Sequence, residues 1–92
     1  MTTEQAIKKI EETLHKSFEL FPEDSYWQPI VSVRNQLDYL KNILERKSDK
    51  SKLNEISIGL ISAREFENDY EDFANMIYEV VDIVKLFKKD KL

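Results

Sequence analysis

The sequence contains no cysteine and only one histidine, His15. A disulfide framework, a thiol nucleophile and a thiolate metal site are therefore excluded, and one chain cannot supply several histidine ligands. One glycine and two prolines leave little turn chemistry for β-hairpins, which argues against an all-β fold. The apolar runs are too short for a signal peptide or a membrane span, so we expect a cytoplasmic protein that does not insert into membranes.

The composition is that of one folded domain. Of the 92 residues, 41% are hydrophobic and 35% are charged. This apolar content supports a core and is too high for a disordered chain, and the length fits a single helical domain covering residues 1–92. A domain of this size rarely encloses a catalytic cleft, so we expect a protein that is not an enzyme and needs no cofactor.

Negative charge is concentrated in one part of the chain. The 18 acidic and 14 basic residues give a net charge of −4, which disfavours nucleic-acid and anionic-membrane partners, since these need a basic face. Residues 65–82 contain seven acids and no base, so this segment carries −7 and the rest of the chain +3. We expect one end of the molecule to carry a negative field.

Apolar residues recur at three- and four-residue spacing in four segments, which is typical of amphipathic helices. Thr2 with Gln5 forms a candidate capping box for the first helix, and Ser25 with Gln28 forms one for the second. Short connections favour antiparallel neighbours. The sequence therefore predicts an all-α fold, a compact antiparallel bundle of four helices at about 3–20, 26–47, 51–65 and 69–89.

The third segment contains the only glycine, Gly59. A glycine inside a helix costs about 1 kcal/mol relative to alanine, so we expect it to mark a close approach to a neighbouring helix. The apolar face of this segment is predicted to hold Leu53, Ile56, Leu60 and Ala63.

His15 has three possible interpretations: a ligand of a di-iron site, a phosphotransfer histidine, or an ordinary histidine at the edge of a helix face. Glu12 and His15 have the spacing of one half of a di-iron motif, but such a site needs a second motif and two further glutamates. A phosphotransfer histidine needs a small residue beside it to admit a partner, whereas Leu14 and Lys16 flank this one. We favour the ordinary histidine and predict no metal site.

Two groups of residues are candidates for binding a partner. Asp69 and Asp72 lie where the last helix begins, and there they either stabilise the positive end of that helix or form a docking surface for a basic protein. Tyr26 and Trp27, at the start of the second helix, either cover the core or act as contact anchors. The candidate partner-binding residues are Glu65, Glu67, Asp69, Tyr70, Asp72, Tyr26 and Trp27.

Four short motifs, in this order and at this spacing, resemble one protein family. They are Gln36-Leu37-Asp38-Tyr39-Leu40, Asp49-Lys50-Ser51, Ile58-Gly59-Leu60-Ile61 and Arg64-Glu65-Phe66-Glu67. The chain is similar, over about residues 21–73, to the small helical immunity proteins of type VI secretion systems that neutralise an NAD(P)+ glycohydrolase toxin. Ser62 stands where that family usually has alanine.

The resemblance implies a binding protein without activity of its own. Its partner would be the catalytic domain of a cognate toxin, and it would act by blocking the entry of NAD(P)+. The residues that contact the toxin do not follow from the resemblance, and we place them at the acidic end as a hypothesis. The alternative function is a helical adaptor or oligomerisation module without a toxin partner, and a homo-oligomeric free state is left open.

Overall fold

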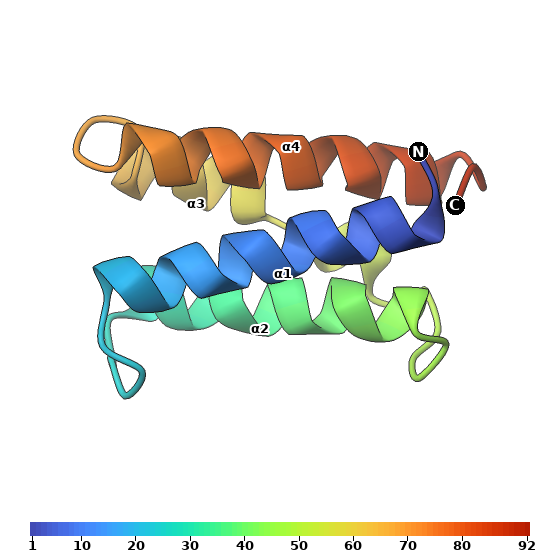
Figure 1. Ribbon diagram of the computed structural model, residues 1–92, viewed down its shortest axis with the longest axis horizontal. Coiled ribbons are helices and arrows are strands. Elements are labelled where there is room, and N and C mark those ends of the chain that lie inside the picture. The colour runs from blue at the N-terminus through green and yellow to red at the C-terminus, as the bar shows by residue number, and fades with distance from the viewer.

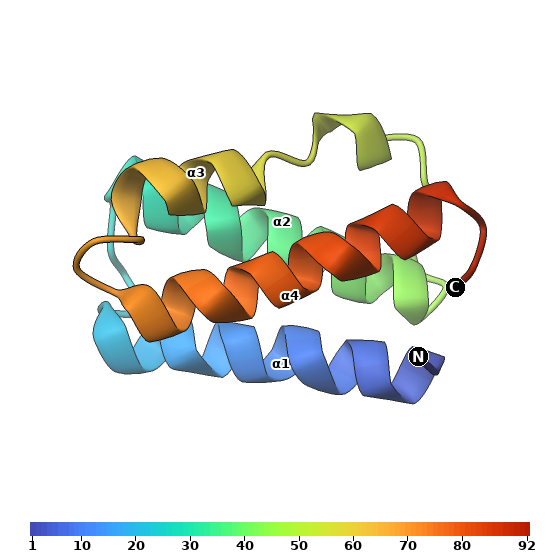
Figure 2. The same cartoon turned by 90° about the horizontal axis from the view of Figure 1, so that it is seen from above.

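The computed structural model describes residues 1–92 and is a bundle of four helices without strands (Figure 1). Each helix packs against two neighbours, in the pairs α1 with α2, α2 with α3, α3 with α4 and α4 with α1. The chain reverses direction at every connection, and both termini lie at the same end (Figures 1 and 2). The predicted antiparallel bundle is confirmed, with helices α1 (Thr3–Leu20), α2 (Gln28–Leu44), α3 (Ile58–Glu65) and α4 (Glu71–Lys88), and a 3-10 turn, η1 (Leu53–Glu55).

The core consists of 18 buried apolar side chains contributed by all four helices, η1 and the turn after α3. In α2 and α4 the residues that recur at helical spacing face inward, among them Leu37 and Ile77, which are fully buried. Each such side chain contributes about 1.5–3 kcal/mol when it leaves water. The periodicity therefore identified the buried faces of α2 and α4 correctly. In α1, Ile10 is buried as expected, but the apolar Phe18 is 47% exposed. The buried face of α1 includes Thr13 and Ser17 instead.

The helix starts are only partly as predicted. The capping box of α1 is confirmed, because Thr2 Oγ1 accepts from the Gln5 N–H at 3.1 Å and Gln5 Oε1 accepts from the Thr2 N–H at 2.8 Å. The box of Ser25 with Gln28 is wrong: α2 begins after Trp27, without a side-chain cap. The Ser25 hydroxyl lies two residues before the N-cap residue Trp27 and instead accepts from the Trp27 N–H at 3.3 Å.

The second helix is shorter than predicted, ending at Leu44 instead of residue 47. Arg46 adopts a left-handed conformation, with φ 61°. The N–H of Lys47 then bonds to the Asn42 carbonyl at 2.8 Å and that of Arg46 to the Ile43 carbonyl at 3.0 Å. This pair of bonds is a Schellman motif, which closes the helix although no glycine is present.

The predicted third helix, 51–65, is wrong in its first half, because it divides into η1 and the shorter α3. Ile56 has an extended backbone, and the N–H of Ser57 donates to Gln36 Oε1 on α2 at 2.7 Å rather than continuing a helix. The helix therefore restarts at Ile58, and the residues that face the core differ from those of one continuous helix over 51–65. As a result Ser62 is buried, whereas Leu60, expected in the core, is 57% exposed.

The motif residues of the α2–α3 region are structural. Besides holding Ser57, Gln36 donates to the Ser32 and Ser57 hydroxyls at 2.9 and 3.1 Å. The Tyr39 hydroxyl donates to the Asp49 carbonyl at 2.8 Å and accepts from the Lys52 N–H at 3.0 Å. These bonds tie the connection between α2 and η1 to the surface of α2.

The Asp49 carboxylate closes a local turn by accepting from the Ser51 N–H at 3.0 Å. Ser51, through its hydroxyl and then its backbone N–H, lowers the pKa of Asp49. A carboxyl group with a lowered pKa stabilises the folded state above its unfolded pKa of about 3.9, and this contribution is lost as the pH falls through the folded value.

Replacing Tyr39 with phenylalanine should lower the free energy of unfolding by about 1–2 kcal/mol, because one hydroxyl makes two hydrogen bonds to backbone groups. Thermal denaturation should show a Tm about 4–8 °C lower for each kcal/mol. Tyr26→Phe is the matched control, since the Tyr26 side chain is exposed, and it should change stability by less than about 0.5 kcal/mol. Equal Tm values for the two variants would contradict this role of Tyr39.

Gly59 lies where α3 approaches α4 closely. A Cβ atom at this position would be 3.2 Å from Val81 Cγ2 on α4. The prediction that this glycine marks a close helix–helix approach is confirmed.

No helix of the bundle is both long and apolar enough to cross a lipid bilayer.

Candidate partner-binding surface

All seven predicted partner-binding residues lie at one end of the bundle, where the α1–α2 and α3–α4 connections meet (Figures 1 and 2). We call this end the acidic tip and define it as residues 21–27 and 64–73. The two segments are about 40 residues apart in the chain, and the antiparallel arrangement of the helices places them side by side. The structure thus brings the two candidate groups into one surface.

Five aromatic rings form the base of the acidic tip. Phe66 is at their centre and is fully buried. Its ring centroid is 5.0 Å from Phe73, 5.6 Å from Trp27, 5.9 Å from Phe21 and 6.2 Å from Tyr70. Phe21 also contacts Tyr70 at 5.0 Å and Trp27 at 5.5 Å. Tilted and edge-on ring pairs of this kind stabilise by about 0.5–1.5 kcal/mol each beyond simple burial, so the tip is a firmly packed part of the molecule.

Trp27 and Tyr26 are the aromatic side chains that the tip offers to solvent. Trp27 packs edge-on against Phe66 and still leaves 40% of its surface exposed, so it both covers the core and presents a contact face. Tyr26 is 88% exposed. Tyr70 is half-buried against Phe21 and mainly supports the cluster.

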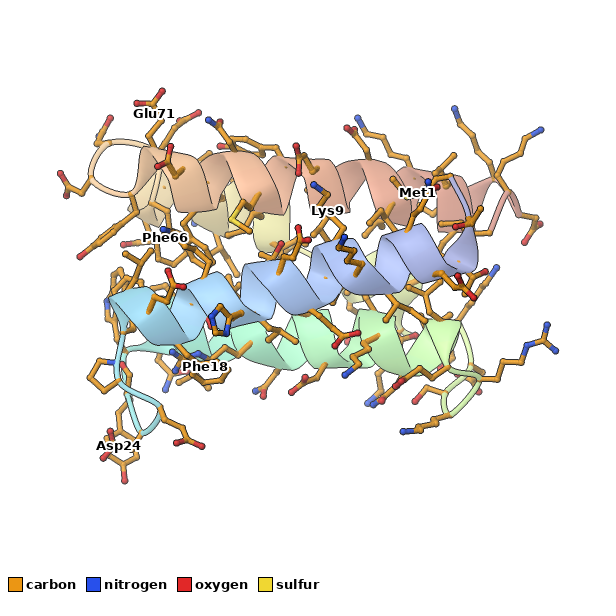
Figure 3. The ribbon with its side chains drawn as sticks, viewed as in Figure 1. Met1, Lys9, Phe18, Asp24, Phe66 and Glu71 are labelled. Atoms are coloured by element: carbon orange, nitrogen blue, oxygen red, sulfur yellow. The ribbon has the colours of Figure 1, made fainter.

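The acidic tip carries seven exposed carboxylates besides these rings. Figure 3 shows Asp24 and Glu71 at opposite edges of this end, with Phe66 between them. None of the tip carboxylates lies within 4.0 Å of a cationic group, although five pairs of lysine with a carboxylate occur elsewhere. Glu67 accepts from the Tyr78 hydroxyl at 3.1 Å. The exposed acids are Glu23, Asp24, Glu65, Glu67, Asp69, Glu71 and Asp72.

A favourable interaction with the positive N-terminal end of α4 explains only some of the acidic residues at the tip. Glu71 and Asp72 lie in the first turn of α4, where a negative side chain is favourable by a few tenths of a kcal/mol. Asp69, expected in the helix, precedes its N-cap residue Tyr70. Glu65 is at the C-terminal end of α3, where a negative charge is unfavourable. The helix ends therefore do not account for Glu65 and Asp69.

Arg34, which we did not single out in the sequence, holds the α1–α2 connection in place. It lies on α2 but is only 8% exposed, and its guanidinium donates to Ser17 Oγ and to the carbonyls of Ser17, Phe21 and Pro22 at 2.9–3.1 Å. Its Cζ also lies 4.2 Å from the centre of the exposed Phe18 ring.

Arg34 supplies a positive charge that α1 lacks, because no basic residue is present in the last turn of that helix. Burial lowers the pKa of Arg34, and the charge of Glu23 opposes this effect. The spacing of the sequence could have identified Arg34 as a buried residue. It follows Ile30 by four residues and precedes Leu37 by three, which places it on the core-facing side of α2.

The single histidine lies outside the acidic tip. His15 is exposed on α1, with Nε2 3.2 Å from Glu19 Oε1. No three histidine or carboxylate side chains are grouped closely enough to hold a metal ion. The exposed position is that of an ordinary surface histidine.

Comparison with known proteins places the chain in a family. The Tsi6 family model matches residues 2–86, a wider region than the residues that carry the resemblance in the sequence. Curated proteins and solved structures each yielded no match. Membership suggests a protein that works by binding a cognate toxin rather than by catalysis. The match runs from the cap of α1 nearly to the end of α4, and the chain belongs to the Tsi6 family of type VI secretion immunity proteins.

Proposed function

We propose that this protein is the immunity partner of an NAD(P)+ glycohydrolase toxin domain and that it blocks the toxin by covering its active site with the acidic tip. The family supports the immunity role, and the motif resemblance supports the choice of toxin class. The observation that carries the choice of surface is the combination, at one end, of unpaired carboxylates with the exposed rings of Trp27 and Tyr26.

The chemistry of the target supports this choice. An enzyme that binds a dinucleotide must hold a pyrophosphate, usually with helix N-termini and with arginine or lysine side chains. Such a cleft carries a positive field, which attracts the unpaired carboxylates of the tip and speeds encounter. Exposed tryptophan and tyrosine are the residue types that most often anchor an interface.

The rigidity and size of the acidic tip also suit an inhibitor that works by occlusion. The buried ring of Phe66 and the hydrogen bonds of Arg34 hold both connections in place before binding, so little ordering cost arises on association. A standard interface needs about 800 Å² from each partner, and the chain exposes 5929 Å² in total. A contact of standard size would therefore use about one seventh of the surface of the chain.

Reversing two tip charges, in the variant Glu65→Lys/Asp69→Lys, should weaken toxin binding about ten- to a hundredfold, or about 1.4–2.7 kcal/mol. Both side chains are exposed and make no ion pair, so the fold should tolerate the change. Titration calorimetry with the toxin domain that we expect to be encoded beside this gene measures the Kd, and a parallel assay follows the loss of NAD(P)+.

The matched control is Glu11→Lys/Glu12→Lys, which changes the net charge equally on the exposed side of α1. If both variants bind like the wild type, the interface lies elsewhere. Binding and growth rescue with a toxin that leaves NAD(P)+ intact would retain the immunity role and discard the glycohydrolase target. Failure to bind any toxin domain would favour the adaptor function.

A further inference from the structure

We propose that the end of the bundle opposite the acidic tip is a second interaction surface and that it docks onto the acidic tip of another copy of this chain. The free protein would then associate head to tail at low salt. This inference concerns the protein alone and does not depend on the activity of the toxin.

The opposite end carries an excess of positive charge. It is formed by the α2–η1 connection, residues 45–52, and by the end of α4, residues 82–92, which lie at the same end in both views (Figures 1 and 2). These two segments contain eight lysines or arginines and four acids, whereas residues 23–24 and 64–72 at the tip contain seven acids and one arginine. We call the positive surface the basic end.

Several cations of the basic end have no partner within the molecule. Lys50 pairs with Asp90 at 3.5 Å, and Lys85 pairs with Asp82 at 3.8 Å. In contrast, Lys88, Lys89 and Lys91 are exposed and make no ion pair. These three side chains are therefore free to meet carboxylates of another molecule.

The two ends cannot neutralise each other within one molecule. The bundle is 33 Å long, and charges separated by much more than the Debye length, about 10 Å at 0.1 M salt, are screened from one another. Two molecules placed end to end bring the opposite charges into contact. The exposed rings of Tyr26 and Trp27 add suitable partners, because lysine ammonium groups bind the faces of aromatic rings.

The geometry predicts the form of the assembly. Each molecule uses two different surfaces, so the contact is heterologous and leaves a free tip and a free basic end at the termini of every oligomer. Oligomers should therefore grow with concentration rather than stop at a dimer. A partner that covers the acidic tip should also block growth at that end.

Sedimentation velocity of the wild-type protein tests the proposal. At about 10 mM salt the weight-average sedimentation coefficient should rise with protein concentration, and at about 1 M salt, where the Debye length is about 3 Å, it should fall to the monomer value. A monomer at all concentrations in low salt, or an oligomer that salt does not affect, would overturn the proposal.

Two variants, each lacking one surface, identify the contact. Glu65→Lys/Asp69→Lys keeps the basic end, and Lys89→Glu/Lys91→Glu keeps the acidic tip; all four positions are exposed and outside ion pairs. Each variant alone should remain monomeric at low salt, whereas an equal mixture should form a dimer that does not grow. A mixture that stays monomeric would contradict head-to-tail docking.

Two further variants distinguish a specific role of the acidic tip from a general effect of net charge. Glu23→Lys/Asp24→Lys removes charge from the other connection of the tip and should act like the first tip variant. Glu11→Lys/Glu12→Lys changes the net charge by the same amount and should associate like the wild type. If this control also abolishes association, net charge rather than the tip is responsible, and the proposal is wrong.

Discussion

Replacing Arg34 with methionine should lower the free energy of unfolding by about 3–5 kcal/mol. The guanidinium is 8% exposed and donates four hydrogen bonds to the end of α1 and the turn after it. Removing one side of a buried polar network leaves the other side without partners, which costs much more than the net contribution of the intact bonds. The Tm should fall by at least about 12 °C.

Two further variants separate the causes of this loss. Arg34→Lys keeps the charge but lacks the planar group that binds several acceptors at once, so it should recover only part of the stability. Arg64→Met is the matched control, because Arg64 is exposed on α3, and it should change stability by less than about 0.5 kcal/mol. Similar losses from Arg34→Met and Arg64→Met in chemical denaturation would show that the buried network contributes little.

Replacing Phe66 with alanine should cost about 3–5 kcal/mol, the usual range for a fully buried phenylalanine. Its ring packs against four other aromatic rings, two from the α1–α2 connection and two from the start of α4. The cavity would lie directly beneath Trp27, so the near-ultraviolet circular dichroism of that side chain should weaken together with the stability. Urea denaturation measures the first effect and spectroscopy at low temperature the second.

Tyr26→Ala is the control for Phe66, because it removes an aromatic ring of similar size that is 88% exposed and contacts none of the five clustered rings. Its stability should match the wild type within about 0.5 kcal/mol. Phe66→Leu should lose less than Phe66→Ala, since leucine fills more of the space. An alanine variant as stable as the control would mean that the cluster collapses around the missing ring without cost.

Much of the fold could be predicted from local patterns. The spacing of Leu37 and Ile77 within their segments identified the buried faces of α2 and α4. Thr2 identified the start of α1, because a capping box involves residues only three apart. Gly59 indicated a tight helix contact, although the sequence could not show that Val81 lies opposite.

The predictions that were wrong or incomplete mostly depend on contacts between residues far apart in the chain. The third helix breaks because Gln36, 21 residues earlier, binds the Ser57 N–H, and no periodicity within the segment reports such a bond. Arg34 matters because α1 ends beside it, which depends on how α1 and α2 pack. The α2 end was placed too late because Arg46 adopts a conformation that glycine usually occupies.

The candidate site, too, depends partly on local sequence and partly on tertiary packing. The sequence alone determined that the protein is helical, lacks thiol chemistry, and concentrates its acids in one segment, since these properties depend on composition and on residues a few positions apart. Only the tertiary structure decided that Trp27 and Tyr26 lie beside those acids and that the unpaired lysines lie at the opposite end. Antiparallel packing of the helices brings distant connections to the same end, and this packing depends on contacts among all four helices.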